Sequence, residues 1–169
     1  MVVLDDEIVS DFTIDEISWQ VHPSAAPSVE FTGFKIYMGI CANDELVASF
    51  DDNYIAGTKT LVIDASSKVI SGNADEWAAL ALDTPYEYDA EAGNLVIEVS
   101  WEGCADYQSF YTYSWDTGTI RSVVNTVAGA PTNPTGTLSS AMSRLKLTGT
   151  ISQELTNITF GGVKSVFNN

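Results

Sequence analysis

The stretch Leu95-Val-Ile97-Glu-Val99-Ser-Trp101 places a large apolar residue at every second position. Alternate residues of a β-strand point to the same face, so these four side chains would form one apolar face. The same period of two recurs along the chain, at Ile17–Val21, Phe34–Met38, Leu46–Phe50, Leu61–Ile63 and Leu145–Ile151. The repeated alternation predicts β-structure almost throughout.

Turn-forming residues separate these runs, for example at Asp51–Asn53, Ala92–Asn94 and Asp116–Gly118. Short strands at intervals of roughly ten residues are typical of an all-β sandwich or barrel. We predict an all-β fold, an antiparallel and jelly-roll-like β-sandwich with little helix, over residues 1–169 as a single domain. The best helical candidate is Ala74–Leu82, which is equally strand-like after one turn. Val127–Ala141 is predicted to be a long surface loop.

The net charge limits which classes of partner the protein can bind. The 169 residues include 7 lysines and arginines against 23 acidic residues, a formal net charge of −16. Such an acidic surface repels phosphate backbones, so nucleic acids and anionic membranes are disfavoured partners. No apolar run approaches the roughly 20 residues that a membrane-spanning helix requires. The 45% hydrophobic content predicts a folded chain with a real core.

Two features bear on the cellular compartment. Met1–Ile8 has neither a basic region nor a long apolar stretch, so we do not expect a signal peptide there. A cytoplasmic protein and the mature part of a longer precursor are both compatible with that start. Cys41 and Cys104 fit no metal or redox spacing. They are either two free thiols or one disulfide that closes a long loop.

Three groups of motifs add a resemblance. The first is Phe34-Lys-Ile-Tyr-Met-Gly39 with Phe50–Asn53; the second is Trp77 followed by Leu82–Asp89 and Gly93–Trp101; the third is Ser143–Leu147. In combination they resemble a β-sandwich module common in secreted and surface proteins of Bacteroidetes-type bacteria. The resemblance extends over about Ile14 to Gly149 and implies an extracellular or cell-surface location more than an activity. The chain departs from that pattern in its acidity and in carrying no attached sorting domain.

Catalytic sets are missing from the sequence. A nucleophilic hydrolase pairs a histidine with a serine, cysteine or threonine, and zinc catalysis needs about three ligands. The one histidine, His22, precedes a proline and is expected in a loop. No motif singles out two of the carboxylates as a glycosidase pair. We therefore predict that the protein is not an enzyme.

Aromatic side chains are the best candidates for ligand binding. Tyr111, Tyr113 and Trp115 alternate onto one face, where exposed rings would form a strip that stacks on sugars. The alternative is that the second sheet or the Val127–Ala141 loop covers this row. Tyr54 is predicted at the rim, and Tyr86 and Tyr88 either join the rim or brace a turn. Trp19 and Trp101 share faces with aliphatic residues and are expected in the core.

Calcium is the one metal that the charge favours. It takes six to eight oxygen ligands, which acidic loops supply. The densest such loop contains Asp51, Asp52 and Asn53, although the spacing of an EF-hand is absent. A hydrated loop without metal is the alternative.

Two functional hypotheses follow. The first is a non-catalytic extracellular binding or adhesion module that recognises carbohydrate on a polymer or cell surface. The second is a structural subunit of a surface fibre or layer. In that case Glu7–Phe12 or Ile158–Phe167 would pair with the edge strand of a neighbouring copy.

Overall fold

The computed structural model describes residues 1–8, 10–105, 108–126 and 130–151. The predicted all-β class is confirmed: the strands pair antiparallel, and the described helices are single 3₁₀ turns. No helix in these residues is long and apolar enough to cross a membrane.

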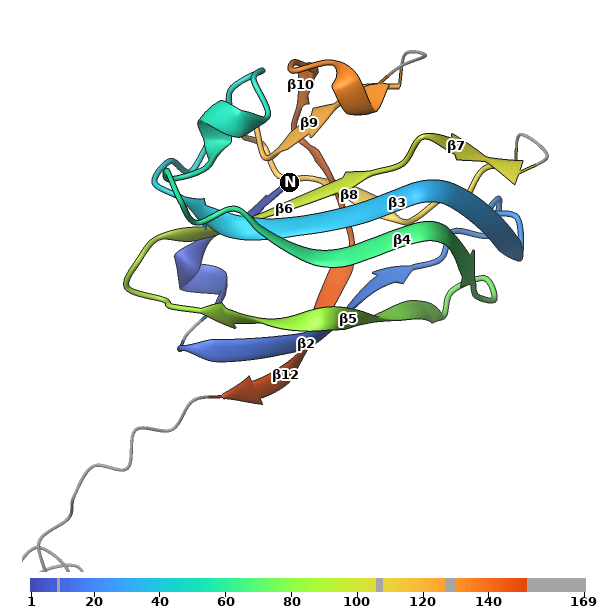
Figure 1. The fold of residues 1–169 in the computed structure, drawn as a ribbon, viewed down its shortest axis with the longest axis horizontal. Helices are drawn as coiled ribbons and strands as arrows, with labels where there is room; N and C mark the ends of the chain where they lie inside the picture. The colour runs from blue at the N-terminus through green and yellow to red at the C-terminus, as the bar shows by residue number, and fades with distance from the viewer. Residues whose placement is uncertain (9, 106–107, 127–129, 152–169) are drawn as a thin grey trace, which may run out of the picture.

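Two sheets dominate the molecule. The first has the order β1 (Val2–Val3), β6 (Asn94–Ser100), β3 (Ser28–Cys41) and β4 (Thr60–Ser71), with β7 (Gly103–Cys104) also paired to β3. The second has the order β12 (Leu145–Ile151), β2 (Phe12–Gln20) and β5 (Trp77–Tyr88). Figure 1 shows the second sheet lying below the first, so the protein is built of two β-layers.

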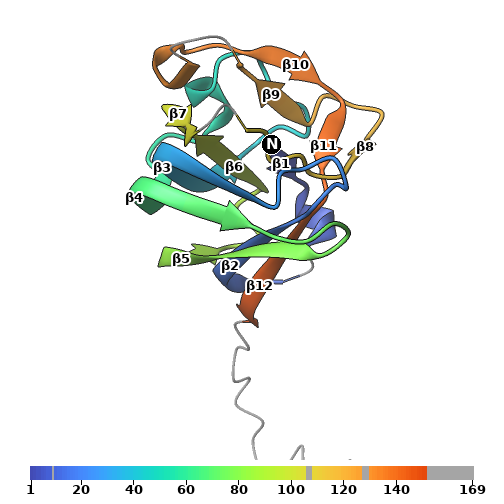
Figure 2. The same ribbon diagram turned by 90° about the vertical axis from the view of Figure 1, so that its right-hand side faces the viewer.

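Shorter elements surround these layers. β8 (Ser114–Asp116) pairs with β11 (Ala141–Ser143), and β9 (Ser122–Val124) pairs with β10 (Thr137–Ser139). Figure 2 shows both pairs beside the first sheet, with β11 leading toward β12. The 3₁₀ turns are η1 (Asp5–Glu7), η2 (Asp51–Asn53) and η4 (Ala130–Thr132).

The core lies between the layers and follows the alternation of the sequence. Phe34, Ile36 and Met38 of β3 are buried in one cluster with Ile14, Ile17 and Trp19 of β2 and with Leu95 and Ile97 of β6. Each such side chain contributes roughly 2 kcal/mol by leaving water. Trp19 is 6% exposed, which confirms its predicted place in the core.

Four local predictions need correction. Leu46–Phe50 is not a strand: Leu46 anchors a loop in a second apolar cluster with Cys41, and the chain then enters η2. Ala74–Leu82 is a turn followed by β5, not a helix. Trp101 is 42% exposed because β6 ends at Ser100, and its ring meets the edge of Phe31 instead. Within Val127–Ala141, the described residues include η4 and β10, so this stretch is not only loop.

Both cysteines are free thiols. Cys41 ends β3, whereas Cys104 pairs with Phe31 near the start of the same strand. Ten residues of strand separate these positions by roughly 33 Å, far more than the roughly 7 Å that a disulfide tolerates. The fold therefore excludes a disulfide within one chain.

The two sides of the layered structure differ. On one side, β4 and β5 follow each other in sequence, and the Asp83 carboxylate accepts a hydrogen bond from the backbone N–H of Asp64, at 3.1 Å. We call this the closed side. On the other side lie β1 and β12, which stand at the ends of the two sheet orders. We call this the open side.

Candidate aromatic binding site

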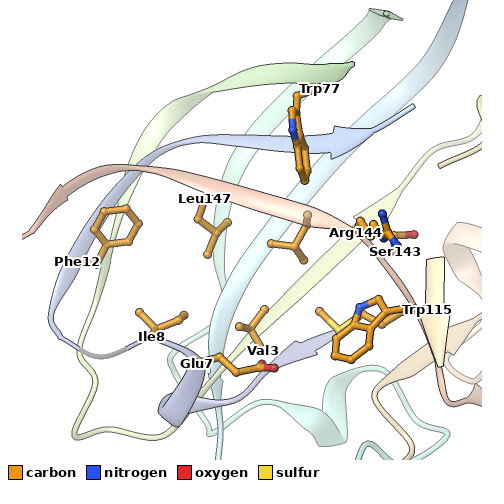
Figure 3. A pocket seen from close by; sticks show the side chains of 11 residues that line it. Val3, Glu7, Ile8, Phe12, Trp77, Trp115, Ser143, Arg144 and Leu147 are labelled. Atoms are coloured by element: carbon orange, nitrogen blue, oxygen red, sulfur yellow. The ribbon is translucent and has the colours of Figure 1, made fainter. Parts of the chain in front are cut away.

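Four aromatic residues lie on segments whose backbones pair near the start of β12, and we call them the aromatic patch: Trp77, Tyr111, Tyr113 and Trp115. Tyr111 is 54% exposed, Trp115 46% and Trp77 40%, while Tyr113 is half-buried. Figure 3 shows Arg144 between Trp77 and Trp115, so the patch bends around the first residues of β12. The predicted row of rings is therefore not covered as a whole.

Backbone pairing holds the row in place. The N–H of His22 donates to the carbonyl of Tyr111, at 3.0 Å, and the N–H of Tyr113 donates to the carbonyl of Gln20, at 2.9 Å. Two residues further on, Trp115 pairs with Met142 across β8 and β11. The end of β2 and the β11 strand thus support the segment from both sides.

Tyr113 is fixed at the centre of the patch. Its hydroxyl donates to the Asp75 carboxylate at 2.6 Å, and this hydrogen bond raises the pKa of the phenol. The ring centroids of His22 and Tyr113 lie 5.0 Å apart in a T-shaped arrangement, and the Arg144 guanidinium lies 5.4 Å from the centre of the Tyr113 ring. These contacts restrict the ring that stands between the two exposed members of the row.

Polar side chains connect the rings. Arg144 donates to the Gln20 side-chain oxygen at 3.2 Å, and the Gln20 amide donates to the carbonyl of Asp75, also at 3.2 Å. Lys146 lies 5.5 Å above the Trp77 ring, a cation–π distance. The patch therefore combines flat apolar surfaces with hydrogen-bond donors and acceptors that are already oriented.

Trp77 was missed as a ligand residue. The sequence Trp77-Ala-Ala-Leu80-Ala-Leu82 holds a signal for this, because its leucines fall on the positions that alternate with Trp77. In the structure Ala78 and Leu80 are buried, and Trp77 lies on the outer face of β5. Its strand neighbour across the sheet is Gln20. That pairing joins Trp77 to the row, which the sequence does not reveal.

Tyr54 lies elsewhere, on the first sheet. Its ring packs on Gly39, and its hydroxyl donates to the Glu98 carboxylate at 3.2 Å. Lys59 lies 4.8 Å above the ring, and burial raises the pKa of the phenol far above its ordinary value. The structure does not bring Tyr54 together with the row of Tyr111, Tyr113 and Trp115.

The predicted rim tyrosines brace the fold. Tyr86 and Tyr88 are both buried, and the Tyr88 hydroxyl donates to the carbonyl of Gly93 at 2.8 Å. Burial raises the pKa of Tyr88 to about 12.

The predicted calcium ligands form η2. Asn53 is buried, and its side chain bonds the backbone of Val47 and Ser49. Asp51 pairs with Lys59 at 2.8 Å. Two of the three predicted ligands thus have protein partners, and the described residues contain no cluster of three or more histidine, cysteine or acidic side chains. Calcium binding stays a prediction.

An apolar groove adjoins the patch on the open side. It has a volume of about 480 Å³. Leu145 and Leu147 of β12 line one wall, and Val3, Ile8 and Phe12 line the other. Figure 3 shows Trp77 on one side of the β12 ribbon, and Ile8, Val3 and Trp115 on the other. Trp77, Trp115 and Arg144 also line this groove, so the groove and the aromatic patch share these three residues.

No protein-family model, curated protein or solved structure matches the chain. The resemblance to surface modules of Bacteroidetes-type bacteria stays a prediction.

Proposed function

We propose that the protein is a non-catalytic binding module that recognises carbohydrate through the aromatic patch. The observation that carries the proposal is that Trp77, Tyr111 and Trp115 are exposed, and that Trp77 and Trp115 line one groove with Arg144, whose guanidinium bonds the Gln20 side chain. Isolated apolar side chains are common on protein surfaces, but a contiguous group with a polar network is typical of binding sites.

The chemistry of the patch suits sugars. One face of a pyranose ring presents C–H groups that pack on a flat aromatic surface, and the rim presents hydroxyls. Trp77 and Trp115 offer such surfaces, and Arg144 and Gln20 offer the donors and acceptors. Since Tyr113 is already held by Asp75, little side-chain entropy is lost at the centre of the patch when a ligand binds.

The location that we propose is extracellular or at the cell surface, where a polymer would present repeated sugars. The net charge of −16 supports solubility there. Several weak contacts along one polymer then add up to useful retention.

The test is retention on polysaccharide gels, followed by a glycan array with and without EGTA. The triple variant Trp77→Ala, Tyr111→Ala and Trp115→Ala is expected to weaken binding at least roughly 100-fold, because each ring supplies an anchor of more than about 1 kcal/mol. Loss of binding in EGTA would separately show that calcium takes part.

Trp101→Ala is the matched control. This tryptophan is equally exposed, but it packs on Phe31 of the first sheet. The control is expected to bind as the wild type does. A wild-type protein that no glycan retains, or a triple variant with unchanged retention, would overturn the proposal.

A further inference from the structure

Two positively charged side chains stand at the aromatic patch without an acidic partner. The chain has seven lysines and arginines, of which one lies in residues 158–167, outside the described part of the chain. Three of the others form ion pairs with carboxylates: Lys35, Lys59 and Arg121. Lys68, Arg144 and Lys146 form none among the described residues, and two of these three, Arg144 and Lys146, contact rings of the patch.

Strand pairing places Arg144 beside Trp77. The N–H of Arg144 donates to the carbonyl of Tyr113 at 2.7 Å, and its carbonyl accepts from the N–H of Gln20 at 3.2 Å. On its other side, Gln20 pairs with Trp77 of β5. Because residues directly opposite each other on paired strands share a face, the side chains of Arg144, Gln20 and Trp77 form one row across the second sheet.

Lys146 adds a second positive charge to this face. It follows Arg144 by two residues, and alternate residues of a strand point to the same face. Its ammonium lies 5.5 Å from the centre of the Trp77 ring. The intervening Leu145 packs against the core, on the opposite face of the strand. One exposed tryptophan thus has two cations beside it.

Both cations keep donors that a ligand can use. A guanidinium carries five N–H donors, and the Arg144 side chain forms one hydrogen bond among the described residues, to Gln20. The Lys146 ammonium forms no hydrogen bond in that part of the chain. The acids on the neighbouring segments, each of which accepts from a protein donor, are Glu16, Asp75 and Glu76. The acids beside the row are therefore bonded within the protein, whereas the cations have no acid.

We propose that the aromatic patch binds acidic sugars, whose carboxylate or sulfate group pairs with Arg144 and Lys146. This inference rests on the proposed carbohydrate function and names the class of its ligand. A guanidinium matches two oxygens of such a group, and an ammonium adds a second point charge. The C–H face of the same pyranose would pack on Trp77, which lies beside both cations.

The net charge of −16 is compatible with this contact. At physiological ionic strength, interactions between exposed charges are largely screened beyond about 8 Å. An anionic group in direct contact with Arg144 and Lys146 therefore responds to these two cations more than to acids elsewhere on the surface.

The first test compares ligands that differ only in charge. Oligogalacturonate carries a carboxylate on each sugar, whereas its methyl ester presents the same pyranose rings without charge. Calorimetric titration of the full chain is expected to show at least roughly tenfold tighter binding of the charged form, which is about 1.4 kcal/mol. Oligosaccharides of a sulfated galactan and their desulfated forms make the second arm, and the two arms show which anionic group is recognised.

The second test removes the cations. Arg144→Gln with Lys146→Gln keeps side chains that form hydrogen bonds, and it is expected to abolish the preference for the charged sugar while the neutral form still binds. Lys35→Gln with Lys68→Gln is the matched control, because it removes the same charge from β3 and β4 of the first sheet. Lys146→Gln alone, at an exposed position, is expected to weaken the preference without disturbing the fold.

Equal affinities for the charged and neutral forms in both arms, or equal effects of the two double variants, would overturn this inference and leave the proposed function intact. Single-stranded DNA that binds as tightly as the acidic sugar would also overturn it, because the cations would then select any polyanion. Absence of binding to every sugar, charged or neutral, would overturn both proposals.

Discussion

The closed and open sides of the protein differ in how the edges of the two sheets are joined. On the closed side, β4 and β5 are neighbours in sequence, and a short turn and the Asp83–Asp64 hydrogen bond join the layers. On the open side, β1 and β12 come from opposite ends of the described chain, and an apolar groove lies between them. Strands joined by a short turn close a layered fold locally, whereas distant strands leave an opening that a ligand or another segment can enter.

Arg121 holds the open side together. It is 4% exposed, and its guanidinium donates to the carbonyl of Val2 and to the Glu7 carboxylate. Arg121→Ala removes the buried partner of β1 and η1, and we expect the free energy of unfolding to fall by about 3 kcal/mol. Urea unfolding measures the loss.

Lys35→Ala is the control on the closed side. The Lys35 ammonium lies 3.8 Å from the Asp64 carboxylate, and the two side chains are 40% and 57% exposed, so the expected loss is below about 1 kcal/mol. Equal losses for the two variants would contradict the distinction between the two sides.

Gly149 sets how closely β12 approaches β2. The pairing shifts register between Thr148 and Gly149, and a Cβ at Gly149 would overlap the backbone carbonyl of Thr13. We expect Gly149→Ala to displace the end of β12 and to lower stability by about 2 kcal/mol. Thermal unfolding measures this change.

Gly103→Ala serves as the comparison, because its Cβ would meet only the Thr32 hydroxyl, at 3.2 Å. Gly149 lies in the second sheet and Gly103 in the first, so the pair of variants tests the two sheets independently. A smaller loss at Gly149 than at Gly103 would refute the argument.

The smallest expected effect is a dependence on pH. The hydrogen bond from Arg121 lowers the pKa of Glu7 below its ordinary value. The ionised carboxylate therefore contributes stability above its ordinary pKa, and this contribution is lost as the pH falls through the lowered value. We expect Glu7→Gln to lose less stability than the wild type between pH 6 and pH 3 (roughly the range in which carboxylates titrate). Asp6→Asn, on the same 3₁₀ turn, should follow the wild type; chemical unfolding at each pH compares the three proteins.

The sequence predicts what depends on local alternation. Leu145–Ile151 is a strand with the predicted bounds, and Trp19 is buried as its pattern requires. The prediction that Trp101 lies in the core was wrong, because alternation does not reveal where a strand ends, and here β6 stops one residue earlier. The prediction of a strand at Leu46–Phe50 was wrong, because a loop can bury an apolar residue such as Leu46 as well as a strand can.

The candidate aromatic patch was predictable only in part, because the sequence reveals local alternation but not which distant segments pair. The alternation of Tyr111, Tyr113 and Trp115 is a local property, and the structure places these three around one strand start. The addition of Trp77 depends on the pairing of β5 with β2, which joins residues far apart in sequence. Tyr54 lies apart from Tyr111, Tyr113 and Trp115 because its ring packs on Gly39, a contact that no local sequence pattern predicts.

The length of β3 has a consequence for the two thiols at its ends. Cys41 is buried in the second apolar cluster, whereas Cys104 is half-buried on the short strand β7. We expect a soluble alkylating reagent to modify half-buried Cys104 in the native protein, and to modify buried Cys41 only after the chain unfolds. Alkylation of Cys41 would therefore report unfolding, while alkylation of Cys104 in the same chain would serve as the internal reference.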